Sequence, residues 1–159
     1  MGNKLENTLV LAISSRALFD LSESHHIFET QGVEAYRQYQ AANENNVLNQ
    51  GIAYPLIEKL LNLNTNDIGA VEIVLLSRNS ADTGLRIFNS IRHYDLNISR
   101  AVFTGGATPY RYAEAFGAHL FLSADAEDVR KAFAELNAAG KIWIISGGTV
   151  EVAEKTAKL

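Results

Sequence analysis

The chain has 159 residues, of which 47% are hydrophobic and 20% charged, and it carries a formal net charge of −4. This composition is typical of one globular domain, and the acidic charge argues against nucleic acids and anionic membranes as partners, because these attract basic surfaces. The lack of cysteine excludes disulfides and thiolate sites, and no apolar stretch approaches the roughly 18 residues of a membrane span, so we expect a cytoplasmic protein.

The first predicted strand is the apolar run from Thr8 to Ser14, a pattern typical of a strand buried on both faces of a parallel sheet. A long polar helix is expected over residues 22–45 with an interruption at Gly32, and Pro55 fits the first turn of another helix. Strands and helices then alternate. The remaining predicted strands are 71–77, 100–104, 119–123 and 141–146, and the remaining predicted helices are 81–94, 109–116 and 125–137.

This alternation predicts an α/β fold, a Rossmann-like three-layer α/β/α arrangement with a parallel sheet of about five strands. More than 50 residues separate the first two predicted strands, which exceeds the usual crossover length. We therefore expect a single domain over residues 1–159. Its core would span about 8–21 and 53–146, and a helical cap-like insertion after the first strand would span about 22–50.

Ligands of open parallel sheets bind beyond the carboxyl ends of the strands, so the residues that follow each strand are candidates for a site. They are rich in hydroxyls, glycines and arginines and poor in carboxylates, a set that suits an anion such as phosphate. The same hydroxyls could instead only cap the following helices. The candidates are Ser14, Ser15, Arg16, Ser77, Arg78, Asn79, Thr104, Gly105, Gly106, Ser123, Asp125, Ser146, Gly147 and Gly148.

Three segments carry a resemblance to a known family: ISSRALFD at the end of the first strand, LLSRNSADTGLRIFNSI, and PYRYAEAFGAHLFLSADAEDV. Over about residues 9–130 the chain resembles the cytosolic type I 5′-nucleotidases. That resemblance implies a fold of the haloacid dehalogenase type, with a cap inserted after the first strand, and Mg²⁺-dependent hydrolysis of nucleoside monophosphates.

The resemblance also assigns roles to positions. In that superfamily an Asp-x-Asp pair ends the first strand, but here Ser14 stands at the nucleophile position and Arg16 at the acid/base position. Serine lacks the anionic oxygen that aspartate offers to phosphorus and to Mg²⁺, and arginine stays protonated. Asp20, six residues past Ser14, is a third catalytic candidate if the loop bends toward the site.

The remaining roles are a phosphate-binding hydroxyl, a basic phosphate ligand and a metal ligand. By position these are Ser77, Arg111 and Asp125 respectively. The other candidates for phosphate or nucleotide binding are Ser15, Arg78, Asn79, Thr104, Gly105 and Gly106. Mg²⁺ is the implied cofactor, although the absence of the Asp-x-Asp pair argues against it.

Family members are longer proteins with two related halves, and the chain resembles the half without the Asp-x-Asp motif. Three functions stay open on these residues. The chain is an active phosphohydrolase whose catalytic groups differ from those of the family, or a catalytically inactive module that binds a nucleoside monophosphate or phosphate. The third possibility is a scaffold that pairs with itself as a homodimer or with a catalytic partner. Phosphate release, stabilisation by nucleotide without turnover, and a stable oligomer would distinguish them.

Overall fold

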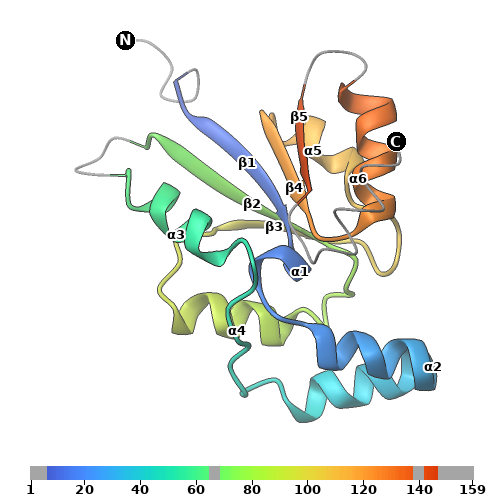
Figure 1. The fold of residues 1–159 in the computed structure, drawn as a ribbon. Coiled ribbons are helices and arrows are strands. Elements are labelled where there is room, and N and C mark those ends of the chain that lie inside the picture. The colour runs from blue at the N-terminus through green and yellow to red at the C-terminus, as the bar shows by residue number, and fades with distance from the viewer. Residues whose placement is uncertain (1–6, 65–68, 138–141, 147–159) are drawn as a thin grey trace.

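The centre of the molecule is a sheet of five parallel strands in the order β3-β2-β1-β4-β5 (Figure 1). The computed structural model describes residues 7–64, 69–137 and 142–146. The strands are β1 Leu9–Ser14, β2 Val71–Ser77, β3 Arg100–Phe103, β4 Leu120–Ser123 and β5 Trp143–Ser146. This sheet confirms the predicted α/β fold, and each predicted strand is present. The strand 71–77 has the predicted bounds, three others are one residue shorter, and residue 141 of the last predicted strand lies outside the described residues.

Two hydrophobic clusters cover the two faces of the sheet. Because successive side chains of a strand point to opposite faces, Leu11 and Ile13 of β1 belong to one cluster, and Val10 and Ala12 belong to the other. Residues of the helices α3 (Tyr54–Leu61) and α4 (Leu85–His93) complete the first cluster. Residues of the helices α5 (Arg111–Ala115) and α6 (Ala126–Ala132) complete the second. Helices therefore lie on both faces, which gives the three layers visible in Figure 1.

The helices follow the predicted alternation with shorter bounds. They are α2 Ser22–Ala42, α3 Tyr54–Leu61, α4 Leu85–His93, α5 Arg111–Ala115 and α6 Ala126–Ala132, which continues as a π-helical turn, Phe133–Asn137. The short helix α1, Ser15–Leu18, was not predicted. The predicted interruption of α2 is present, because Gly32 has a φ of 88° and a non-helical conformation.

The segment that carries α2 leaves the sheet and returns to it at one place. Phe19 pairs with Gln50 in an isolated antiparallel bridge, and the Gly51 N–H donates to the Leu18 carbonyl over 2.8 Å. A Cβ on Gly51 would lie 2.6 Å from the Ala17 oxygen, so only glycine allows this approach. In Figure 1, α2 lies beyond α1, past the carboxyl ends of the strands.

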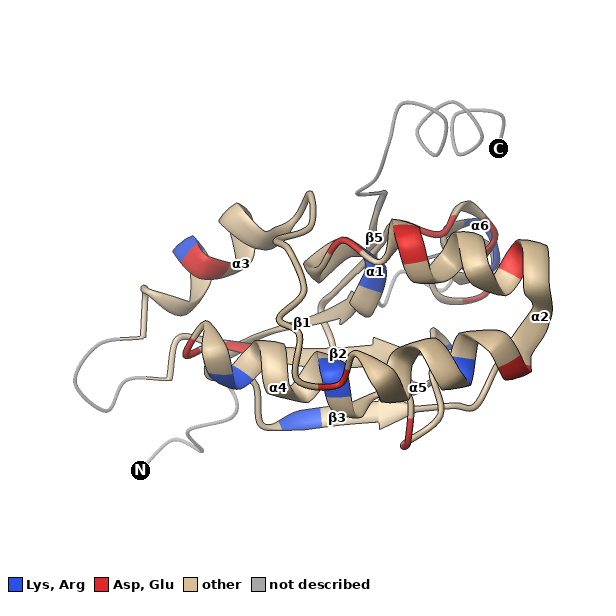
Figure 2. Cartoon of the chain, turned by 90° about the horizontal axis from the view of Figure 1, so that it is seen from below, with Lys and Arg blue, Asp and Glu red and all other residues tan. Residues whose placement is uncertain are grey.

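Charged residues are spread over the described elements. In Figure 2 the Lys and Arg positions are spread over several elements, among them α1, α3, α4 and β3, and lie among acidic positions rather than on one helix. Of the helices that the structure describes, none is long and apolar enough to cross a membrane.

Candidate functional site

A pocket of about 480 Å³ lies at the carboxyl edge of the sheet, between the strand ends and α2. We call it the strand-end pocket. Its walls come from β1 and α1, from the segment after β2, from the turn after β3, from the start of α6, and from α2. The residues used below that line it are Ser14, Ser15, Arg16, His25, Phe28, Tyr36, Arg78, Asn79, Gly105, Gly106, Asp125 and Asp128.

The serines at the end of β1 are buried and hydrogen-bonded. Ser14 Oγ accepts the N–H groups of Ala17 and Ala124, each over 3.3 Å, so this hydroxyl caps α1 and ties β1 to the residue that follows β4. Ser15 Oγ lies 3.0 Å from Ser77 Oγ at the end of β2. The predicted serines are thus brought together, and both Ser14 and Ser15 line the pocket.

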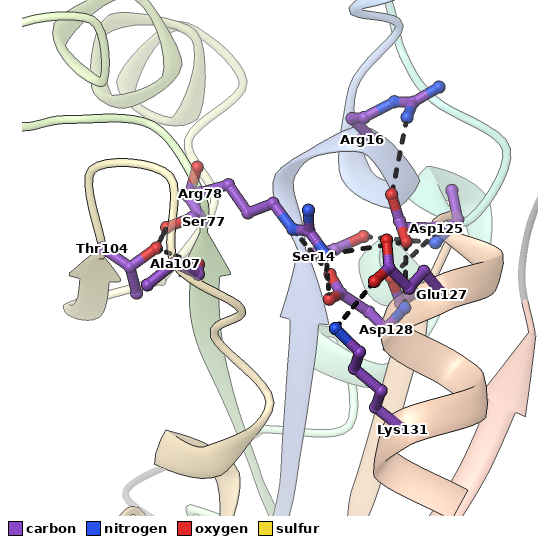
Figure 3. Close-up of polar contacts among 12 residues, drawn as sticks. Ser14, Arg16, Ser77, Arg78, Thr104, Ala107, Asp125, Glu127, Asp128 and Lys131 are labelled. Carbon is purple, nitrogen blue, oxygen red and sulfur yellow. Dashed lines mark hydrogen bonds and ion pairs between the residues drawn. The ribbon is translucent and has the colours of Figure 1, made fainter.

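Two arginines and two aspartates form an ion-pair network on one side of the pocket (Figure 3). Arg78 binds Asp128 with two hydrogen bonds, one from Nε over 3.2 Å and a shorter one from a terminal nitrogen, and that nitrogen lies 3.8 Å from Asp125. Arg16 lies 4.0 Å from the other Asp125 oxygen. Arg78 is therefore firmly held, whereas Arg16 is held less firmly, by a long ion pair within the described part of the chain.

Burial and charge shift the pKa values of two groups in this pocket. Burial raises the pKa of Asp128, whose side chain is 3% exposed, and the hydrogen bond and charge of Arg78 act in the opposite direction. Burial, followed by the positive charge of Arg16, lowers the pKa of His25, although Glu29, 3.1 Å from its Nε2, opposes the shift. The pKa of His25 therefore depends on the charge of Arg16.

Helix α2 supplies an aromatic wall that touches the strand ends. The Tyr36 hydroxyl donates to Asn79 Oδ1 over 2.7 Å, which joins α2 to the segment after β2. Phe28 lies edge-on to Tyr36 and nearly parallel to His25, with ring centroids 6.0 and 6.4 Å away. Asn79 Nδ2 is buried and has no hydrogen-bond partner among the described residues, so one amide donor beside the pocket is unused.

The glycine pair after β3 forms a turn that borders the pocket. Gly105 and Gly106 have φ values of 64° and 110°, a region that favours glycine. Their N–H groups donate to the carbonyls of Asn79 and Arg78, so these amides already close the turn. Thr104 is outside the pocket lining, and its hydroxyl donates to the carbonyls of Ser77 and Ala107.

The structure places two other candidates away from the pocket. Asp20 is exposed, and its carboxylate accepts the N–H and the hydroxyl of Ser22, which lowers its pKa. Arg111 is also exposed and pairs with Glu135 at 3.9 Å. Gly147 and Gly148 lie outside the described residues.

The residues present do not suit Mg²⁺, the cofactor that the resemblance implies. Mg²⁺ needs oxygen ligands in near-octahedral geometry, usually with one or two carboxylates. Both Asp128 oxygens face Arg78, and Asp125 lies between two arginines while it caps α6 through the Asp128 N–H. Within the described ranges, no group of three or more His, Cys, Asp or Glu side chains is placed to hold a metal ion.

Among the pocket residues that sequence reasoning did not name as site candidates are His25, Phe28, Tyr36 and Asp128. From the sequence, the three residues of α2 were placed only within the long polar helix expected over residues 22–45. Asp128 carried a usable signal, because it lies three residues past the helix cap Asp125, on the turn that faces the strand ends.

Comparisons with known proteins show the family of the chain. The family model described as 5′-nucleotidase matches residues 1–157. The chain is also 36% identical over 139 residues to cytosolic 5′-nucleotidase 1B of Homo sapiens, an alignment that covers 83% of this chain and 23% of that protein. The chain thus spans about a quarter of the length of this relative. The comparison with solved structures found no match.

The family match covers nearly the whole chain, including every strand and every wall of the strand-end pocket. The resemblance predicted from three sequence segments is therefore confirmed over a longer range. This chain belongs to the 5′-nucleotidase family.

Proposed function

We propose that this chain binds the phosphate of a nucleoside monophosphate in the strand-end pocket and does not itself hydrolyse it. The observation that carries the proposal is that two guanidinium groups, those of Arg16 and Arg78, reach one pocket from two neighbouring strands. Guanidinium is the side-chain group best matched to a phosphate, since it offers a planar set of N–H donors.

Arg16 is the principal phosphate ligand in this proposal. Its ion pair with Asp125 is long, at 4.0 Å, and its side chain is 38% exposed. Its N–H donors can therefore bind an anion without breaking a strong hydrogen bond. Arg78 donates two hydrogen bonds to Asp128, and its positive charge adds to the attraction of the pocket for an anion. The unused Asn79 amide donor next to the pocket supports a ligand rich in acceptor oxygens.

The nucleoside part of the ligand would lie against α2. Phe28 is 47% exposed and lines the pocket beside His25 and Tyr36, which gives a base an aromatic surface on which to stack. The pocket volume of about 480 Å³ is in the range of small-molecule sites.

The chemistry at the strand ends supports binding rather than hydrolysis. Hydrolysis by the family mechanism needs an aspartate where Ser14 stands and a proton-transferring acid where Arg16 stands. Ser14 Oγ also accepts two backbone N–H groups, which makes the oxygen a poorer nucleophile. Asp20, the candidate replacement, is held by Ser22 outside this pocket.

The chain would accordingly act as a catalytically inactive half-domain that binds a nucleotide within the 5′-nucleotidase family, of which a human member is named a cytosolic 5′-nucleotidase. Titration calorimetry with inorganic phosphate, a nucleoside and the matching nucleoside monophosphate tests the proposal. We expect the monophosphate to bind most tightly, because it engages both Arg16 and the aromatic wall. Absence of heat with all three ligands, together with a stable oligomer, would favour the scaffold function instead.

A further inference from the structure

We infer that the Arg78 guanidinium takes the place of a divalent cation between Asp125 and Asp128, so that this pocket holds its anion without a metal. The inference deepens the proposed function and rests on it only for the ligand-binding part of the test below. The substitution of a guanidinium for a cation can be tested without any ligand.

The contacts of Arg78 carry this inference. One of its terminal nitrogens lies against an Asp128 oxygen and 3.8 Å from an Asp125 oxygen, while its Nε donates to the second Asp128 oxygen over 3.2 Å. A single positive group thus bridges two carboxylates that follow β4, as a bound cation would. Figure 3 shows the side chain reaching across the end of β1 to these carboxylates.

A divalent cation at this point would meet strong opposition. It would have to displace Arg78 from Asp128, which is almost fully buried, and then lie beside a displaced guanidinium of like charge. Arg16, on the other oxygen of Asp125, adds a second repulsive charge. Arg78 therefore occupies the position that a metal ion would take, and the positive charges of both arginines repel such an ion.

A guanidinium differs from a metal ion in what it offers an anion. Arginine has five N–H donors, and the two hydrogen bonds to Asp128 leave others for a phosphate oxygen. The bridging group is covalently part of the chain, so its occupancy does not depend on the Mg²⁺ concentration. Binding of the phosphate should therefore be insensitive to chelators.

The first test uses thermal unfolding and Mn²⁺ alone. In Arg78→Ala, Asp128 becomes a buried carboxylate without its partner, so we expect a lower Tm than for wild type, and Mn²⁺ should raise that Tm. The Arg78→Ala/Asp128→Asn double variant should unfold at a higher temperature than Arg78→Ala and should not respond to Mn²⁺. Arg37→Ala, which removes an exposed pair with Asp82, is the matched control and should not gain a Mn²⁺ response.

Binding of Mn²⁺ is measured independently by the loss of its free electron paramagnetic resonance signal. Arg78→Gln, which keeps most of the side-chain volume, replaces Arg78→Ala if the alanine variant does not fold. A wild-type protein that binds Mn²⁺ as tightly as the Arg78 variants would overturn the inference. So would Arg78 variants whose Tm responds neither to Mn²⁺ nor to Asp128→Asn.

The second test compares binding of a nucleoside monophosphate to the wild type in EDTA and in Mg²⁺. The inference predicts the same affinity in both within twofold. Binding that appears only with Mg²⁺ would overturn the inference and leave the proposed binding function standing. Absence of binding in both buffers would refute the proposed function, while the Mn²⁺ results would still decide whether Arg78 substitutes for a cation.

Discussion

Arg78, at the end of β2, pairs with Asp128, in the first turn of α6, across the carboxyl end of β1. The pair closes one side of the strand-end pocket and takes both oxygens of the buried carboxylate. The charge at this edge of the sheet is thereby balanced by side chains alone. In this respect the pocket differs from a site in which aspartates surround a metal ion.

Arg16→Ala should weaken binding of a nucleoside monophosphate by about tenfold, because a charge-assisted hydrogen bond contributes about 1.5 kcal/mol or more. Titration calorimetry measures the effect. Arg111→Ala is the matched control, since Arg111 is exposed and lies outside the pocket lining. Equal affinities of the two variants would show that the anion does not bind at Arg16.

Binding of a phosphate at Arg16 should raise the pKa of His25. In the free protein, burial lowers this pKa below its ordinary value of 6.5, and the positive charge of Arg16 lowers it further. An anion bound beside Arg16 offsets that positive charge. Proton NMR of the imidazole ring, with and without ligand, measures the shift, and His25→Gln identifies the resonance. An unchanged His25 titration at saturating ligand would place the anion elsewhere.

The same lowered pKa makes the free protein less stable in mild acid. The unfolded chain takes up a proton on His25 near pH 6.5 before the folded chain does, so folding stability decreases as the pH falls below that value. Urea unfolding at pH 7.5 and pH 5.5 measures this decrease. His25→Gln should reduce the difference between the two pH values, and a difference as large as that of the wild type would show that another group causes the decrease.

Tyr36→Phe should loosen α2 from the strand ends. The substitution removes the hydrogen bond to Asn79 Oδ1 and leaves that partly buried amide with a second unused atom, at a cost of about 1 kcal/mol. Hydrogen exchange over α2 should become faster. Arg37→Ala, which breaks an ion pair that is about half exposed on both sides, should change exchange less. A larger effect of Arg37→Ala would mean that the exposed pair, not Tyr36, anchors the helix.

Gly51→Ala should destabilise the junction between α1 and the segment that carries α2. Its Cβ would lie within 2.7 Å of backbone atoms of Ala17, Leu18 and Phe19, and such overpacking costs about 1–3 kcal/mol. The Tm should fall by several degrees in thermal unfolding. Gly69→Ala, where a new Cβ meets no atom within 4 Å, should leave the Tm close to that of wild type.

Local patterns were sufficient to predict most of the fold. The apolar runs that form β1 and β2 are long enough to be recognised as buried strands, and the interruption at Gly32 follows from the residue itself. Helix α1 escaped prediction because it depends on a cap from Ser14 Oγ to a single turn, which is too short to show a periodic pattern. The ends of the longer helices shifted by a few residues, as helix ends commonly do.

The site was harder to predict because its contacts join elements that are distant along the chain. The serines and arginines at the strand ends could be named, since all parallel strands end at one edge. The pairing of Arg78 with Asp128 depends on β2 and β4 flanking β1, and this order is not readable from the sequence. The positions of Asp20 and Arg111 depend on local loop geometry, which the sequence does not show. These residues were named as candidates only because they lie near strand ends in the sequence.

The most direct test of the central claim is a phosphate-release assay on a panel of nucleoside monophosphates with Mg²⁺, run beside a thermal-shift experiment on the same panel. We predict that at least one nucleotide raises the Tm of the wild type, that Arg16→Ala makes this rise smaller at the same nucleotide concentration, and that no phosphate is released. Phosphate release that scales with the amount of chain, and that disappears in Asp125→Asn, would contradict the account and identify the chain as an active phosphohydrolase.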